Sequence, residues 1–154
     1  MDSLFRVASV TDPDAHELLA EYFAMRAAGF DPAAGSYQTV FPDPARFTEP
    51  AGVFLVVEDD GTPVGCGGIR MLEPHRAEVK HLYLRDAVRG RGWGRLLLAE
   101  LERRARGLGA TEAVLDTNVS LEAAGSLYRS NGYVEIPPYN DNPNATTWFR
   151  KDIA

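Results

Sequence analysis

Arg89-Gly90-Arg91-Gly92-Trp93-Gly94 (residues 89–94) is the stretch that decides the fold. It lies between a segment predicted to be a strand and a segment predicted to be a helix. The first backbone N–H groups of a helix have no partner within the helix, and the helix dipole adds about half a positive charge there. Glycines let a phosphate approach the bare backbone, and Arg89, Arg91 and Arg95 add formal positive charge. The stretch therefore predicts a site for a polyphosphate.

The segments on either side have the spacing of regular structure. Residues 77–84 predict a strand. Residues 92–108 predict the strongest helix of the chain, because its leucines and alanines recur on one helix face, and glycines at 107 and 109 mark its end. A phosphate site is expected where a strand is followed by a helix across a glycine-rich turn.

The remaining chain alternates short strands and helices. Strands are expected over residues 4–10, 53–58, 64–72, 113–117, 133–136 and 146–151, and helix starts at residues 11–14, near 44–47 and at Ser120 as a cap. An antiparallel meander followed by one β-α-β crossover predicts an α/β (α+β) fold. Its central sheet should be mixed but mostly antiparallel, with about six or seven strands and helices on both faces. The length of 154 residues predicts a single domain over residues 1–154.

Charge is spread unevenly along the chain. The net charge is −6, yet residues 76–106 carry +5 and the other residues −11. On the predicted helix, Glu100–Arg104 and Glu102–Arg106 are expected as exposed i,i+4 pairs. An acidic body argues against nucleic-acid binding, and no apolar run approaches the ~20 residues of a membrane span. Neither nucleic acid nor a membrane is therefore expected as a partner.

The cysteine and histidine content limits which cellular compartment and which cofactors are expected. A single cysteine, Cys66, excludes an internal disulfide and is expected to be a small core residue. The first residues, Met1–Phe5, show no signal-peptide pattern, so a cytoplasmic location is expected. The three histidines fall on different predicted elements, so no metal site is expected.

Three classes of polyphosphate could use the glycine-rich turn. A Walker loop needs a lysine followed by Ser or Thr after its glycines, and the chain has none here. A dinucleotide motif matches only in part, because Arg95 stands where its third glycine would be, although Asp116 could mimic its ribose-binding acid. That fold also needs more β-α-β units than this chain offers. The third class is coenzyme A.

The turn resembles the signature of the GNAT superfamily of N-acetyltransferases, Arg/Gln-x-x-Gly-x-Gly/Ala, at Arg89, Gly92 and Gly94. The preceding strand, and downstream Ala124–Tyr128 followed by Asn131–Tyr133, resemble neighbouring motifs of that family. The resemblance covers roughly residues 4–152. It implies an acyl-CoA N-acyltransferase fold, acetyl-coenzyme A (acetyl-CoA) as cofactor, and transfer of the acetyl group to a primary amine of a small molecule.

The resemblance also implies which residues form the site. The family separates two parallel strands and binds pantetheine along the first, while the diphosphate lies on the turn. Glu78 matches a strand position that holds a glutamate base, and Tyr128 matches a tyrosine that protonates the leaving thiolate. The implied cofactor-binding residues are Leu82, Tyr83, Leu84, Arg89, Gly90, Arg91, Gly92, Trp93, Gly94, Arg95, Asn118, Ser126 and Tyr128. One departure concerns Leu121, which stands where many members have an asparagine, and Asn118 is the nearest substitute.

The acceptor end is expected in the variable loops, at residues 30–47 and 139–142, with Tyr37, Tyr139 and Asn140 as candidate contacts. His81 is an alternative base, although strand alternation should turn it away from Glu78 unless a bulge intervenes. Two other functions stay open. One is an acyl-CoA-binding sensor without catalysis, and the other is an acetyltransferase for protein lysines or N-termini. The terminal strands could also pair between subunits, which would give a homodimer.

Overall fold

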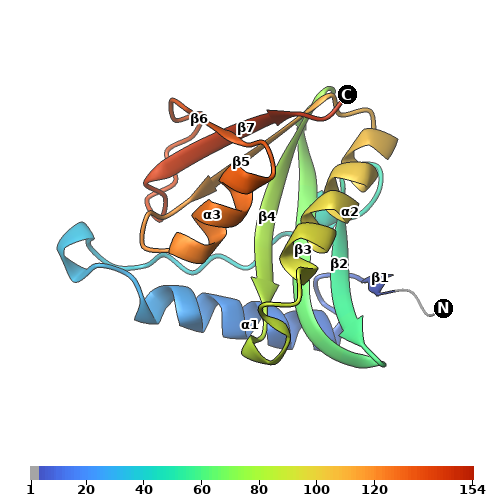
Figure 1. Cartoon of the computed structure of the whole chain (residues 1–154), viewed down its shortest axis with the longest axis horizontal. Helices are drawn as coiled ribbons and strands as arrows, with labels where there is room; N and C mark the ends of the chain where they lie inside the picture. The colour runs from blue at the N-terminus through green and yellow to red at the C-terminus, as the bar shows by residue number, and fades with distance from the viewer. Residues whose placement is uncertain (1–3) are drawn as a thin grey trace.

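The computed structural model describes residues 4–154, which form a seven-stranded mixed sheet with three α-helices (Figure 1). Residues 1–3, part of the N-terminal segment in which no signal-peptide pattern is expected, lie outside the described residues. The strands are β1 (Phe5–Val7), β2 (Gly52–Asp59), β3 (Thr62–Glu73), β4 (Arg76–Leu84), β5 (Glu112–Thr117), β6 (Val134–Ile136) and β7 (Thr147–Asp152). The α-helices are α1 (Pro13–Ala28), α2 (Trp93–Gly107) and α3 (Glu122–Ser130), and short 3-10 helices cover Pro32–Ala34, Pro44–Phe47 and Asp86–Val88.

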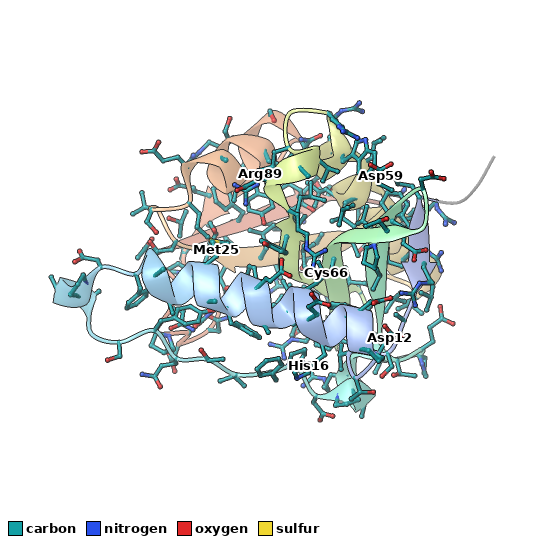
Figure 2. All side chains as sticks on the ribbon, turned by 90° about the horizontal axis from the view of Figure 1, so that it is seen from below. Asp12, His16, Met25, Asp59, Cys66 and Arg89 are labelled. Atoms are coloured by element: carbon teal, nitrogen blue, oxygen red, sulfur yellow. The ribbon has the colours of Figure 1, made fainter. Side chains whose placement is uncertain are left out.

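The predicted fold class is confirmed. The strand order is β1-β2-β3-β4-β5-β7-β6, and only β4 and β5 pair in parallel, across α2. Side chains alternate across β2, so Val53 and Leu55 join the core under α2 while Phe54 and Val56 join the core under α1. The helices therefore cover both faces, and Figure 2, seen from below, shows α1 in front of strand β3 with its Cys66. Cys66 is buried, as expected of a core residue.

Strands β4 and β5 separate soon after they meet. Their pairing covers only Arg76–Glu78 against Glu112–Val114, although both strands continue beyond these residues. In Figure 1 the two strands run together near the C-terminus and then diverge, with α3 in front of the widening gap. The edge of β4 that faces β5 therefore lacks a strand partner beyond Glu78.

A bulge in β4 changes which way its side chains face. The register between β3 and β4 shifts between Cys66 and Gly68, and His81 adopts a positive φ of 59°. Val79 packs in the core under α2, and Lys80 faces the opposite side of the sheet. Because of the bulge His81 faces that same side, where its ring contacts Phe23 of α1 with centroids 5.5 Å apart.

Two local predictions are wrong. Ser120 does not cap α3, because its N–H donates to the Asn118 side chain and the Leu121 N–H donates to the Asn118 carbonyl, so the helix begins only at Glu122. Glu102 does not pair with Arg106 but is buried, where it accepts hydrogen bonds from Tyr133 Oη at 2.8 Å and Lys151 Nζ at 3.0 Å.

Other local predictions are confirmed. Arg104 pairs with Glu100 at 2.8 Å. The Asp12 side chain caps α1 by accepting a hydrogen bond from the Asp14 N–H at 2.9 Å. No helix within residues 4–154 is both long and apolar enough to cross a membrane.

Candidate active site

A cavity of about 1080 Å³ lies where β4 and β5 diverge. Its walls come from the second half of α1, the loop at residues 37–47, β4 after the bulge, the glycine turn, the end of β5, α3 and the loop at residues 140–144. Figure 2 labels two of its wall residues, Met25 on α1 and Arg89 on the turn before α2. The cavity therefore joins the predicted phosphate turn to the predicted acceptor loops.

The glycine turn presents free backbone donors to this cavity. Gly90 and Gly92 have φ values of 80° and 77°, a conformation that favours glycine. α2 begins at Trp93 without a side-chain cap. Within the described part of the chain, no acceptor binds the backbone N–H groups of residues 90–95. The turn thus has the donor geometry of an anion site at a helix N-terminus.

The three arginines of the turn differ in their surroundings. Arg89 lines the cavity and contacts Asp86 at 3.2 Å. Arg95 also lines the cavity, and no carboxylate among residues 4–154 pairs with it. Arg91 does not line the cavity, because it pairs with Asp59 at 3.3 Å and lies over the Trp93 ring. The side chains of Arg89 and Arg95, rather than Arg91, therefore add charge at the cavity.

The close approach of α2 and α3 depends on Gly94. A Cβ atom at this position would lie 3.3 Å from the Leu127 side chain on α3. The small residue thus lets α3 close the cavity beside the turn. Leu82, Tyr83 and Leu84, the predicted pantetheine strand, form the facing wall.

Tyr128 presents its side chain to the cavity from α3. Its ring packs against Tyr133 and Phe149, and the residue is only 7% exposed. Among residues 4–154 the Tyr128 hydroxyl has no hydrogen-bond partner, and it is not sealed from solvent. Burial raises the pKa of this hydroxyl, so it is protonated at neutral pH and available as a donor.

Glu78 lies behind the cavity wall rather than in it. Its carboxylate is completely buried, and it accepts hydrogen bonds from Arg70 Nε at 2.7 Å and from Tyr139 Oη at 2.6 Å. Burial, followed by the Glu78 charge, raises the pKa of Tyr139. Glu78, predicted as the base, and Tyr139, predicted as an acceptor contact, are thus joined by a hydrogen bond. Neither residue lines the cavity.

His81 does line the cavity, on the side of the acceptor loops. Its imidazole is packed among Tyr22, Phe23 and Phe47, and no described residue forms a hydrogen bond with its ring nitrogens. Burial, with the charges of Lys80, Arg70 and Arg26, lowers the pKa of His81 to about 3. The ring is therefore neutral at physiological pH.

The other predicted acceptor contacts lie in the cavity wall. Asn140 donates a hydrogen bond to Asp116 at 2.8 Å, and Tyr37 packs under the guanidinium of Arg26, 5.1 Å from its ring centroid. Burial raises the pKa of Tyr37 to about 12. Arg26 also lines the cavity and is not among the predicted site residues. Its sequence signal is a charged side chain at a helix position where the other residues of the same face are apolar.

Asn118 and Ser126 lie outside the main cavity. Both line a smaller cavity of about 590 Å³ beyond α3. The Asn118 amide is already used, since it donates to the Asn144 carbonyl at 3.2 Å and accepts from the Ser120 N–H at 3.0 Å. In this arrangement Asn118 holds the loop before α3, and its predicted contact with the cofactor gains no support from the geometry.

Comparison with known proteins places the chain in a family. The family model described as the acetyltransferase (GNAT) family matches residues 13–133, so the chain belongs to the GNAT family. This family uses acetyl-CoA.

Two curated relatives are 37% identical to this chain over part of their length. An uncharacterized N-acetyltransferase of Schizosaccharomyces pombe is 37% identical over 100 residues, which are 64% of this chain and 61% of the relative. An IAA acetyltransferase of Azospirillum brasilense is 37% identical over 87 residues, 56% of this chain and 57% of the relative. The matched segments thus span about three fifths of the length of these relatives.

Solved structures match over nearly the whole chain. A protein of Klebsiella pneumoniae assigned as an acyl-CoA N-acyltransferase superposes with a TM-score of 0.80 at 26% identity, covering 97% of both chains. The PaiA N-acetyltransferase of Thermoplasma acidophilum, solved in complex with coenzyme A, superposes with a TM-score of 0.75 at 20% identity, covering 99% of both. The fold is therefore that of the GNAT acyl-CoA N-acyltransferases.

Proposed function

We propose that the protein transfers an acetyl group from acetyl-CoA to a primary amine of a small molecule. One observation carries the proposal. The unpartnered N–H groups of the glycine turn and the unpartnered hydroxyl of Tyr128 border the same cavity, between two strands that have separated. This cavity can bind a polyphosphate at one end and act on a thioester at the other.

The residues of the cavity suit acetyl-CoA, which supplies an acetyl group activated as a thioester. The N–H groups of residues 90–95, with the Arg89 and Arg95 side chains, would hold its phosphates. The free edge of β4 at residues 82–84 would hydrogen-bond its pantetheine amides, because that edge has no strand partner. Tyr128 would donate its proton to the sulfur that leaves, since its raised pKa keeps it protonated.

The acceptor must lose a proton, because an alkylammonium has a pKa of about 10. We assign this proton to Glu78 through Tyr139. Because neither residue lines the cavity, a water molecule would carry the proton from the ammonium to the Tyr139 hydroxyl, which would pass its own proton to Glu78 along the hydrogen bond of 2.6 Å. His81 is the alternative base, since its neutral ring lines the cavity on the same face.

Two contacts favour a small acceptor over a protein. The Gln38 N–H donates to Asn144 Oδ1 at 2.9 Å, and Asn144 Nδ2 donates to the Gln38 carbonyl at 2.7 Å. These hydrogen bonds join the loop at residues 37–47 to the loop at residues 140–144. An acceptor end bounded by two joined loops suits a small amine better than an extended peptide.

The decisive experiment measures release of free thiol from acetyl-CoA with a panel of small amines and, in parallel, a panel of peptides. Thiol release with small amines supports the proposal. Release only with peptides would indicate a protein acetyltransferase instead. Tight binding of acetyl-CoA in calorimetry without thiol release from either panel would indicate a sensor.

A further inference from the structure

We propose that the acceptor amine also carries a carboxylate, as an amino acid does, and that Arg26 binds this carboxylate. The inference rests on the proposed acetyl transfer and names the chemical class of its acceptor. It depends on one buried cation in the cavity wall and on the groups around it.

Arg26 is buried without a counter-ion. The residue is only 9% exposed, and no carboxylate among residues 4–154 lies within ion-pair distance of it. Its guanidinium donates to two neutral oxygens, Tyr22 Oη at 3.0 Å and the Asn144 carbonyl at 3.1 Å. Arginine stays charged at any physiological pH, and a buried charge without an opposite charge is unfavourable. A carboxylate on a bound ligand would supply that opposite charge.

The other partly buried cations of the cavity differ from Arg26. Arg70 pairs with Glu78 at 2.7 Å, and Lys80 pairs with Asp116 at 3.6 Å. Arg46, Arg89 and Arg95 are exposed, and the latter two belong to the phosphate end. In the described residues, Arg26 is thus the buried cation of the acceptor end that remains to be neutralised.

The carboxylate at the same end of the cavity is already paired and does not neutralise Arg26. Asp116 accepts hydrogen bonds from Asn140 Nδ2 at 2.8 Å and Asn142 Nδ2 at 3.1 Å, and Lys80 Nζ lies 3.6 Å from it. Arg26, Asp116 and Tyr128 all line this cavity, so a carboxylate bound to Arg26 would lie in the same cavity as the Tyr128 hydroxyl.

The neighbours of Arg26 are aromatic. Its guanidinium lies over the Tyr37 ring, and Phe23 packs against Tyr37 and His81. Aromatic walls beside a cation favour an amino acid with an apolar side chain, because its carboxylate meets the charge and its side chain meets the rings.

The test compares amino acids with the amines that lack only the carboxylate. We would measure kcat/KM for three pairs: phenylalanine with phenethylamine, leucine with 3-methylbutylamine, and methionine with 3-methylthiopropylamine. The amino acid of the best pair should be favoured by about 10- to 100-fold, the range of a charge-assisted hydrogen bond. Arg26→Gln should abolish this preference through KM, Arg26→Lys should retain part of it, and Arg103→Gln, an exposed control on α2, should leave it unchanged.

A binding measurement separates this inference from the proposed function. Calorimetry with the N-acetyl derivative of each amino acid and of its amine needs no turnover. If the carboxylated derivatives bind more tightly and Arg26→Gln removes the difference, the inference stands even where no thiol is released. If wild-type protein binds or acetylates the amines as well as the amino acids, the inference is overturned while the acetyltransferase function remains.

Discussion

Arg76 Nε and Glu112 Oε1 lie 2.5 Å apart at the point where β4 and β5 meet, directly before the two strands separate. Arg150 of β7 donates to the other oxygen of Glu112 at 2.6 Å. Three neighbouring strands are thus joined through one buried carboxylate. The closed end of the diverging pair is stabilised by ion pairs, while its open end borders the cavity of the candidate active site.

This relationship predicts a stability that depends on pH. Burial alone would raise the pKa of Glu112, but Arg76 and Arg150 together lower it. A carboxyl group with a lowered folded-state pKa stabilises the fold above its unfolded pKa, about 4.3, and this contribution is lost as the pH falls through the folded pKa. We expect Glu112→Gln to reduce the free energy of unfolding by roughly 1–3 kcal/mol at pH 7. Urea unfolding at pH 7 and pH 3 checks this, because the difference from wild type should shrink in acid. An equal difference at both pH values would contradict the ionic origin.

Tyr128→Phe should separate binding from catalysis. We expect kcat to fall by about 10²–10⁴-fold, the range of proton-transfer roles, with the affinity for acetyl-CoA unchanged. Steady-state kinetics and calorimetry measure the two quantities. Tyr133→Phe is the matched control, because it also removes a buried hydroxyl but from a residue bound to Glu102, away from the cavity wall. Full turnover in Tyr128→Phe would remove this residue from the mechanism.

The relay from Tyr139 to Glu78 predicts two variants with the same phenotype. Glu78→Gln and Tyr139→Phe should each lower kcat by about 10²-fold or more, and the double variant should be no worse than either, because both interrupt one path. His81→Asn should retain most of the activity. Loss of activity in His81→Asn alone would transfer the role of base to the histidine.

The glycine turn allows a matched comparison of two substitutions. Gly90 and Gly61 have φ values of 80° and 81°, and a Cβ atom at either position meets nothing within 4 Å. Alanine at either site should therefore cost a similar ~1–2 kcal/mol in conformational strain. Only Gly90→Ala should weaken acetyl-CoA binding, since Gly61 lies on the β2–β3 hairpin away from the cavity. Equal acetyl-CoA affinities in calorimetry would show that the turn does not hold the phosphates.

Local patterns in the sequence predicted the fold and a glycine turn that lies beside the cavity. Turn residues, helix spacing and the glycine signature act over a few positions, so the meander, α2 and the phosphate turn could be predicted. The orientation of His81 could not be predicted, because the β4 bulge arises from pairing with β3. The contact between the Cys66 thiol and the His81 carbonyl, for example, joins residues fifteen positions apart in the sequence. The burial of Glu102 likewise depends on Tyr133 and Lys151, which are distant in sequence.

The acceptor end is the part that sequence reasoning described least completely. The predicted acceptor contacts Tyr37 and Asn140 line the cavity, but their partners Arg26 and Asp116 come from α1 and β5 and meet them only in the folded protein. The hydrogen bond from Tyr139 to Glu78 spans sixty-one residues, so no motif could have contained it.

The loop at residues 140–144 contacts both charged groups of the acceptor end, through Asn140 and Asn142 to Asp116 and through the Asn144 carbonyl to Arg26. One short segment therefore positions both groups. Under the proposed function, replacing these five residues would change the surroundings of Arg26 and Asp116 at once while the glycine turn is left intact, which makes this loop the first segment to vary when acceptor selectivity is to be altered.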